Sequence, residues 1–571
     1  MGLRYTLVFV AVTLLFTSGC QQSQSTAQTS TQFPAQASVA SAHPLATQAG
    51  MDILAEGGNA FDAAIAVASV LGVVEPYSAG IGGGGFWLLH RAADGKEVMI
   101  DAREKAPLAA THDMYVNKKG KVNRDLAVNG PLSAGIPGQP AAFAHITNAY
   151  GTLPLNRTLK HAIHHADQGF QVDRVYLQLA AYREKVLSRF PESHSTLVTN
   201  NLTTDTVITQ KDLARTLNTL ATKGKAGFYQ GPLAQQLVNG VTEAGGIWQL
   251  DDLLQYNVIE RQPITFTYNN NNSLVKIVSA PPPSSGGVAL AEMFNMLEAM
   301  EYPSLDPLTQ HHVLVEVMRR AYRDRAEHLG DSDFYPVPVS QLIDPIYGQN
   351  LAKSINLSKA TDSSSLGKSY GNHSGTHTTH LSVIDKHGNY VSATLSINLP
   401  FGSGFTVPGT GVLLNNEMDD FSALPGSPNA YGLVGSQANA IAPGKRPLSS
   451  MTPTFAEFTV DNHKQVAILG TPGGSRIITM VFLGLLEAIE GKTPEDWVSR
   501  HRFHHQYLPD AIQIEPNTFS KFEKAQLQRL GHKLKPVGRR YGNMQAILWN
   551  QQTGKVSAAS DPRGVGEARV K

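Results

Sequence analysis

Hydrophobic and polar positions follow two different periods along this chain. Residues 390–396 alternate between apolar and polar side chains, and a turn at 386–389 separates them from the strand-like residues 381–385, so this stretch predicts a β-hairpin. Residues from about 158 to 244 instead carry apolar side chains at helical spacing, with charged faces between them. The chain is therefore expected to combine helices with strands.

Two further helices are predicted from local signals. An Ala-rich run over 60–68 follows Asn59, a favoured N-cap residue, and Glu75-Pro76 ends the helix because proline disfavours helix at the residue before it. The small residues of this run indicate close packing against a sheet. Residues 311–329 predict a second, amphipathic helix, and its basic face is interpreted as ordinary surface charge.

Two glycine- and proline-rich segments are interpreted as turns. Gly80–Phe86 contains a run of glycines but lacks the Gly-Lys-Ser/Thr ending of a P-loop and leads into a strand-like run, so nucleotide binding is not expected. Pro281–Gly287 is expected to form a rigid turn before a helix that begins near Val288. Neither segment predicts a cofactor.

Composition narrows the choice of function. The chain has 571 residues, 51 of them glycine, and a net charge of +1. This charge gives no electrostatic reason to expect nucleic acid as a partner. The abundance of glycine favours a loop-rich protein of mixed helix and sheet over a helical bundle.

The amino terminus is expected to be an export signal. Arg4 precedes a short apolar run over 7–16, and the sequence Thr17-Ser18-Gly19-Cys20 is similar to a bacterial lipobox. We therefore predict a lipoprotein-type signal peptide over 1–19, lipidation of Cys20 and a periplasmic, membrane-anchored protein. A plain secretory signal that is cut nearby is the alternative. Residues 20–42 are expected to form a disordered tether, because they are rich in Gln, Ser, Thr and Ala.

The strongest candidate for chemistry is Thr378, in the segment 375–380. A threonine hydroxyl is hardly ionised at neutral pH and needs a nearby base, and the free α-amine of the same threonine is one known solution. That amine exists only if the peptide bond between His377 and Thr378 breaks first. The alternative interpretation is simply the start of a β-strand, since Thr378-Thr379 precedes an apolar run.

Charged residues that follow two strand-like runs suggest a site for a zwitterion. Arg103 comes after the apolar run 98–100, and its guanidinium fork matches the two oxygens of a carboxylate. Residues 411–421 predict a strand that ends in acidic groups, which suit an ammonium group. For both segments, a solvated loop is the alternative.

Hydroxyl and glycine groups could complete such a site. Ser449 and Ser450 offer two adjacent hydroxyls, and Gly473 and Gly474 lie between a strand-like run and a helix that is expected to begin near Ile477. Successive glycine amides at a helix N-terminus can stabilise an oxyanion, because no Cβ blocks close approach.

Taken together, these segments resemble γ-glutamyltranspeptidase, a family of the N-terminal nucleophile hydrolase superfamily, from about residue 43 to the end. The most specific segments are 57–64, 80–86, 101–107, 281–287, 378–380, 413–421, 446–451, 470–477 and 503–506. The resemblance implies an α+β fold, a four-layer αββα sandwich formed by two autoproteolytic subunits. Cleavage between His377 and Thr378 would give a large subunit, 43–377, and a small subunit, 378–571, that remain associated.

The resemblance also implies a role for each site residue and no metal or organic cofactor. Thr378 is the nucleophile, and Thr379 hydrogen-bonds to it. The implied binding groups are Arg103, Ser449 and Ser450 for the substrate α-carboxylate, Asn398, Glu417 and Asp420 for the α-amino group, and Gly473 and Gly474 for the oxyanion. The implied substrates are glutathione and related γ-glutamyl compounds, with water, amino acids or peptides as acceptors.

Two positions depart from the family pattern, and one loop matches a feature of some members. Ser396 occupies a position near the nucleophile that is usually threonine in the family. Its hydroxyl is expected to keep the role of the threonine hydroxyl, and its effect on the maturation rate is left unpredicted. Glu417 occupies a position that is glutamine in some bacterial members. Residues 425–431 resemble a lid loop, which Tyr431 would close.

Two other functions remain as alternatives. A cephalosporin or glutaryl acylase would share the fold and the nucleophile, but it would not need an acid for an α-ammonium group. A non-catalytic zinc-binding lipoprotein would use His373, His377 and His380, although a loop of Ser, Gly and Thr is a poor frame for a metal.

Overall fold

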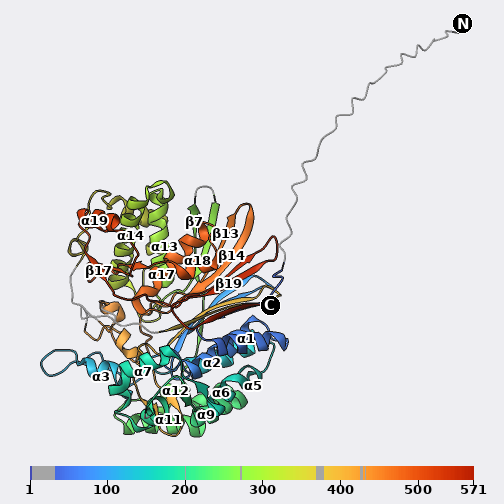
Figure 1. Cartoon of the computed structure of the whole chain (residues 1–571), viewed down its shortest axis with the longest axis vertical. Helices are drawn as coiled ribbons and strands as arrows, with labels where there is room; N and C mark the ends of the chain where they lie inside the picture. The colour runs from blue at the N-terminus through green and yellow to red at the C-terminus, as the bar shows by residue number, and fades with distance from the viewer. Residues whose placement is uncertain (3–32, 200, 271–272, 368–377, 425–428, 431–432) are drawn as a thin grey trace. The chain divides into compact units, whose positions relative to one another are not determined.

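The computed structural model describes residues 1–2, 33–199, 201–270, 273–367, 378–424, 429–430 and 433–571. The chain divides into two units, residues 1–31 and residues 32–571. Every helix and strand named below belongs to the second unit (Figure 1).

Two antiparallel sheets form the centre of this unit. The seven-stranded sheet has the order β20 (Glu567–Val570), β1 (Ser38–Ser41), β9 (Thr379–Ile384), β10 (Tyr390–Ser396), β2 (Gly84–Arg91), β3 (Lys96–Ala102) and β6 (Ile259–Arg261). The six-stranded sheet has the order β19 (Val556–Ser560), β18 (Gln545–Asn550), β14 (His463–Gly470), β13 (Thr454–Val460), β8 (Ser273–Ser279) and β7 (Ile264–Asn270).

The two sheets face each other, and β2 shows how the sequence produces this arrangement. Side chains alternate between the faces of a strand. Trp87 and Leu89 pack into the cluster that holds the helices after β1, whereas Phe86 and Leu88 pack into the cluster that holds the second sheet. Polar contacts also join the sheets, since Ser392 Oγ of β10 donates to the carbonyl of Leu469 in β14 at 3.0 Å.

Helices cover the outer face of each sheet (Figure 1). The helices on the side of the seven-stranded sheet include α1 (Pro44–Ala55), α2 (Ala60–Val74), α4 (Gln139–Ala149), α6 (Lys160–Gln168), α7 (Arg174–Leu187), α9 (Lys211–Lys223) and α11 (Gly231–Glu243). Those on the side of the six-stranded sheet include α13 (Gly286–Ala299), α14 (Pro307–His328) and α17 (Ile477–Ile489). The expected mixture of helices and sheets is confirmed.

The local signals for α2 act as the sequence predicts. The Asn59 side chain accepts hydrogen bonds from the amides of Phe61 and Asp62 at 3.0 Å, and Asp62 accepts from the Asn59 amide in return. Asp385, which directly follows β9, accepts from the Ala60 amide at 2.9 Å. The helix ends at Val74, so Glu75 lies at its C-cap, as expected from Pro76.

The hairpin and two predicted helix starts are also confirmed. β9 and β10 pair antiparallel with Ile384 opposite Tyr390. α13 begins at Gly286 and α17 at Ile477. Residues 411–421 differ from the prediction, since β12 spans only Val412–Leu413 and a 3-10 turn covers Glu417–Asp420. The Asn415 side chain bends the chain here, accepting from the Glu417 amide and donating to the Gly82 carbonyl.

The disordered tether predicted over residues 20–42 overlaps the first strand of the fold. Residues 38–41 form β1, an inner strand of the seven-stranded sheet between β20 and β9. Its small side chains fit between two packed layers, and its serines are satisfied, because Ser38 Oγ donates to the Arg569 carbonyl and Ser41 Oγ lies 2.7 Å from Thr47 Oγ1. A polar composition therefore did not exclude a buried strand.

Candidate active site

Thr378 lies directly before β9 with only 6% of its surface exposed. Its Oγ1 is 3.5 Å from Oγ of Ser396, the last residue of β10. The pairing of Leu395 with Thr379 in the hairpin brings these two hydroxyls together. Ser396 Oγ also accepts a hydrogen bond from the Asn398 amide at 2.7 Å, which fixes its position. The hydroxyl of Ser396 thus lies where the sequence placed it, near the candidate nucleophile.

The next residue, Thr379, contacts an acid that the sequence interpretation treated only as a helix end. Thr379 Oγ1 donates to Glu75 Oε2 at 3.0 Å, and the Tyr77 hydroxyl donates to Glu75 Oε1 at 3.2 Å. Burial raises the pKa of Glu75 to about 7, although the hydrogen bond from Thr379 opposes this. Since its proton is directed at Glu75, the Thr379 hydroxyl can serve Thr378 only as an acceptor.

Most of the predicted binding residues meet in one narrow cavity of about 20 Å³ that Thr378 also lines. The predicted residues that line this narrow cavity are Arg103, Ser396, Asn398, Asp420, Ser449, Ser450 and Gly474. Glu417 is connected to them through Arg103. Gly473 and Thr378 also line a second, wide cavity of about 280 Å³. The structure thus brings together residues that are more than 300 positions apart in the sequence.

Arg103 is buried and held by acids. Its Nη1 donates to Glu417 Oε2 at 2.5 Å, its Nη2 donates to Asp420 Oδ2 at 2.5 Å, and its Nε donates to the Pro447 carbonyl at 3.2 Å. Both candidate segments are therefore packed against each other, and neither is a solvated loop. The arginine expected to bind a carboxylate and the acids expected to bind an ammonium are each other's counterions here.

The Arg103 cluster contains more carboxyl groups than guanidinium groups. Glu104, Glu417 and Asp420 all lie around the single guanidinium of Arg103. Burial raises the pKa of Glu417 well above its ordinary value, against the pull of Arg103, and burial likewise raises the pKa of Glu104 to about 7. Burial alone would lower the pKa of Arg103, but the surrounding carboxylates raise it. An added cation would therefore favour the ionised form of these carboxyl groups.

The two glycines have backbone conformations that residues with side chains rarely adopt. Gly473 and Gly474 both have positive φ, 149° and 59°, directly before the short turn that opens α17. A Cβ on Gly473 would lie 2.4 Å from Met480 Cε, so a side chain is excluded unless Met480 moves. Among the described residues, neither amide N–H has a hydrogen-bond acceptor. Both can therefore donate to a developing negative charge beside Thr378.

The serine pair is fixed by a second buried arginine. Arg325 of α14 donates from Nη2 to Ser450 Oγ at 3.2 Å and from Nε to Ser285 Oγ at 3.0 Å. Ser285 Oγ in turn donates to the Ser449 carbonyl at 2.7 Å. Arg325 lines the narrow cavity, and no carboxylate lies within ion-pair distance of it in the described part of the chain. It is a second cation at the site.

The basic face of α14 is not surface charge, contrary to the sequence interpretation. Arg319, Arg320 and Arg325 are 1%, 1% and 4% exposed. Arg319 and Arg320 pair with Glu316 of the same helix, which makes their burial possible. The spacing of these residues matches a helix face, but the pattern could not say that the face points inward.

Several sequence-based predictions lie outside the described residues. They concern His377 of the cleavage site, Tyr431 of the lid, Cys20 of the lipobox and His373 of the zinc alternative. His380, the remaining histidine of that alternative, is buried, with Nδ1 2.9 Å from Thr394 Oγ1 and Nε2 3.2 Å from Ser382 Oγ. Both of its ring nitrogens are engaged, so it would have to break these contacts to bind a metal.

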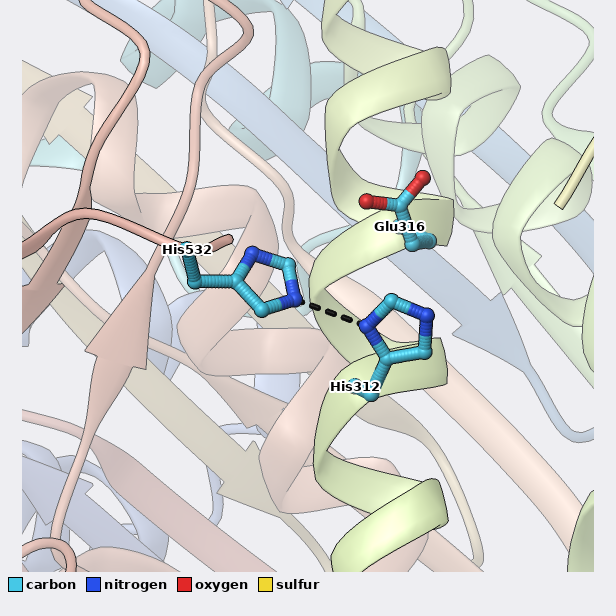
Figure 2. Close-up of side chains that lie close together, drawn as sticks. All are labelled: His312, Glu316 and His532. Carbon is cyan, nitrogen blue, oxygen red and sulfur yellow. Dashed lines mark hydrogen bonds between the residues drawn. The ribbon is translucent and has the colours of Figure 1, made fainter. Parts of the chain in front are cut away.

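One cluster of metal-ligand types occurs elsewhere, at His312, Glu316 and His532 (Figure 2). His312 Nδ1 lies 2.7 Å from His532 Nε2, while His312 Nε2 lies 2.9 Å from the Asn356 carbonyl. A carbonyl can only accept, so His312 is protonated at Nε2 and its Nδ1 accepts from His532. Glu316 is already paired with Arg319 and Arg320. Both ring nitrogens of His312 are engaged, and His532 Nδ1 is the buried nitrogen of the cluster without a hydrogen-bond partner among the described residues. Two arginines lie beside the cluster, which makes it a poor setting for a metal ion.

Two site residues were missed by the sequence interpretation. Glu75 could have been noticed as an acid that directly follows a long apolar helix, a position that is buried unless the chain turns outward. Arg325 carries no such signal, because it lies among other charged residues on α14.

No helix within the described residues is long and apolar enough to cross a membrane.

Comparison with known proteins identifies the family of this chain. The family model described as gamma-glutamyltranspeptidase matches residues 46–570. The chain is 39% identical to the glutathione hydrolase proenzyme of Escherichia coli, over 93% of this chain and 91% of that protein. It is 40% identical to the glutathione hydrolase proenzyme of Pseudomonas sp. strain A14, over 87% of this chain and 86% of that protein.

Solved structures of related enzymes share the fold of this chain. A cephalosporin acylase from Bacillus halodurans is 28% identical, with a TM-score of 0.82 over 97% of this chain and 99% of that chain. A γ-glutamyltranspeptidase chain from Helicobacter pylori is 36% identical, with a TM-score of 0.54 over 58% of this chain and 96% of that chain. The family model and the aligned regions of these relatives cover nearly the whole chain. We conclude that the chain belongs to the gamma-glutamyltranspeptidase family.

Proposed function

We propose that this enzyme transfers the γ-glutamyl group of glutathione and related compounds to water, amino acids or peptides. The observation that carries this proposal is the juxtaposition of Arg103, Glu417 and Asp420 in a buried cluster at the narrow cavity, which Thr378 also lines. A γ-glutamyl compound presents an α-carboxylate and an α-ammonium on one carbon. The carboxylate would pair with Arg103, and the ammonium would pair with Glu417 and Asp420.

Maturation is proposed to create the catalytic base. Thr378 Oγ1 attacks the His377 carbonyl carbon, the peptide C–N bond breaks, and an ester joins His377 to the Thr378 oxygen. Water then hydrolyses this ester and leaves Thr378 with a free α-amine. Residues 43–377 and 378–571 would become the two subunits of an αββα sandwich of the N-terminal nucleophile hydrolase type.

The strand order supports association of the two fragments after cleavage. In the seven-stranded sheet, β9 and β10 lie between β1 and β2, and β20 pairs with the other edge of β1. Strands from both sides of the proposed cut therefore alternate across one hydrogen-bonded sheet. Separation would break several strand pairings and expose the apolar faces between them.

The chemical step follows from the same residues. The Thr378 amine takes the proton of Oγ1, which attacks the γ-carbonyl carbon of the donor, and the amides of Gly473 and Gly474 would stabilise the oxyanion. The γ C–N bond breaks, and the proton passes from the amine to the leaving nitrogen. Water or an acceptor amine then attacks the γ-glutamyl ester, and Thr378 recovers its hydroxyl. Ser396 and Thr379 would position this hydroxyl.

An acylase that accepts a glutaryl group is the second candidate, favoured by the similarity to the Bacillus halodurans structure. A glutaryl group has no α-ammonium, so it would leave the acids around Arg103 without an added cation. Hydrolysis of γ-glutamyl-p-nitroanilide and glutaryl-p-nitroanilide separates the two candidates. A preference for the glutaryl compound would overturn the γ-glutamyl assignment.

The first test of the whole proposal is the state of the purified protein. Wild-type enzyme should give two fragments on a denaturing gel, and the smaller one should begin at Thr378 on amino-terminal sequencing. A T378A variant should remain one chain and release no p-nitroaniline. A wild-type chain that stays intact yet is active, or a different amino terminus, would refute the mechanism.

Export to the periplasm and lipidation of Cys20 also belong to this proposal. They rest on the sequence of residues 1–20 alone. Fractionation of cells that express the full chain, with a C20S variant as control, tests both. A lipid anchor predicts that wild-type protein sediments with membranes and that C20S is released into the periplasmic fraction.

A further inference from the structure

The wide cavity beside Thr378 differs from the narrow cavity in both size and charge. It has a volume of about 280 Å³, near the lower end of ordinary small-molecule pockets. The narrow cavity is lined by the γ-glutamyl-binding residues, whereas the wide cavity is lined mainly by residues of α7 and of the loops around 540 and 564. Thr378 lines both cavities, whereas Gly473 lines the wide cavity and Gly474 lines the narrow one. A group bound in the wide cavity would therefore meet the nucleophile from the other side.

The wide cavity is basic. Arg174, Arg539 and Arg540 line it and are exposed to solvent, and none of them has a carboxylate within ion-pair distance in the described part of the chain. Arg174 is oriented by a hydrogen bond from Nη2 to the Gly564 carbonyl at 2.8 Å. These guanidiniums gather at one opening without counterions, which disfavours a cationic occupant and favours an anionic one.

The other charged lining groups do not cancel this charge. Arg563 is neutralised by Glu515 at 2.7 Å and Asp561 at 3.0 Å. Glu75 is the one carboxylate among the lining residues, but it is only 3% exposed and its oxygens accept from Thr379 and Tyr77. The accessible charge of the wide cavity is therefore that of Arg174, Arg539 and Arg540.

We propose that the wide cavity is the site of the leaving group and of the acceptor amine, and that its arginines select amino acids or short peptides with a free α-carboxylate. This inference rests on the proposed γ-glutamyl transfer. Once the γ-glutamyl group fills the narrow cavity, the scissile nitrogen must leave toward the wide one. In glutathione this nitrogen belongs to a dipeptide that ends in a carboxylate. An acceptor amine enters by the same route, its nitrogen bonds to the γ-carbonyl carbon, the ester C–O bond breaks, and its proton returns to Thr378 Oγ1.

The test compares two acceptors that differ only at the carboxyl end. Transfer from γ-glutamyl-p-nitroanilide to glycylglycine and to glycylglycinamide is measured for wild type, for R539Q/R540Q and for R529Q. Arg529, at the end of α19 (Lys521–Arg529), is exposed and lies outside both cavities, so R529Q controls for lost charge.

Wild type and R529Q should show a lower KM for glycylglycine than for its amide. In R539Q/R540Q the KM for glycylglycine should rise about five- to tenfold, while the KM for the amide changes little. Rising salt should weaken glycylglycine binding in wild type more than in the double variant. Both fragments on a gel and an unchanged melting temperature establish that the variants are folded.

Two outcomes overturn the inference. Either wild type uses the acid and the amide equally well, or the double variant keeps the wild-type preference. The proposed function is judged separately, by whether wild type releases p-nitroaniline from γ-glutamyl-p-nitroanilide at all. A wild type that does so without any carboxylate preference would retain the proposed function and lose only this assignment.

Discussion

Arg103 Nη1 lies 2.5 Å from Glu417 Oε2, so the two halves of the proposed zwitterion site are bonded to each other. Removing either partner of a buried ion pair leaves an uncompensated charge, which is costly. The Arg103–Glu417 and Arg103–Asp420 pairs avoid this cost. A substrate that brings one carboxylate and one ammonium exchanges these contacts without leaving a charge unpaired, whereas a ligand with a single charge does not.

This exchange predicts how Arg103 variants behave. R103K keeps the charge but loses the planar fork, so kcat/KM for γ-glutamyl-p-nitroanilide should fall by about 100-fold, equivalent to roughly 3 kcal/mol. The analogue 4-aminobutyryl-p-nitroanilide lacks the α-carboxylate and should already be poor for wild type. R103K should lower its kcat/KM much less. Equal losses for both substrates would show that Arg103 does not contact the carboxylate.

Ser396 is expected to control maturation. Its hydroxyl lies 3.5 Å from the Thr378 hydroxyl and accepts from the buried Asn398 amide. S396A removes the acceptor of that amide, so the rate of precursor cleavage should fall by about tenfold or more. S396T keeps the hydroxyl and should be cleaved at a rate close to that of wild type. A time course of fragment appearance on a gel measures this, and equal rates for S396A and S396T would contradict the role.

The sequence predicted the elements around the site better than their burial. The hairpin 379–396, the helix starts near 288 and 477 and the capped helix after Asn59 follow from local turn, cap and periodicity signals, because neighbouring residues determine them. Most of the binding residues that the resemblance implied line the narrow cavity, and their roles stay predictions. Neither source showed that Arg103 and Glu417 are counterions, since a contact between residues so far apart in sequence is set by how the loops pack.

Burial explains the errors. The segment 38–41 looked like tether because it is small and polar, yet its hydroxyls are satisfied inside a sheet. The arginines of α14 looked like surface charge, yet Glu316 and the serine loops pair with them. In both cases composition gives the average preference of a residue type, while hydrogen-bond partners supplied by distant segments decide the outcome.

Glu75 makes stability depend on pH. Its folded-state pKa of about 7 is above the ordinary value of 4.5, so between these values the folded protein binds more protons than the unfolded one. Its ionisation therefore lowers the free energy of unfolding as pH rises from about 4.5 to 7. E75Q removes this cost, and its stability relative to wild type should improve across that range by roughly 2–3 kcal/mol. Denaturant unfolding of the matured proteins at pH 5 and pH 8 measures the difference, and a pH-independent difference would contradict the assignment.

Arg325 is expected to act as a positioning residue for substrate binding. It reaches the Ser450 hydroxyl directly and the Ser449 backbone carbonyl through Ser285, so it fixes the segment that carries the hydroxyl pair proposed to meet the α-carboxylate. R325Q should therefore raise KM for γ-glutamyl-p-nitroanilide by about tenfold or more, with a smaller effect on kcat, because Thr378 and the oxyanion amides are untouched. R325K keeps a cation that can donate to one serine at a time and should restore part of the lost binding. A merely structural role would lower the melting temperature of both variants and reduce kcat and kcat/KM together, without partial rescue by lysine.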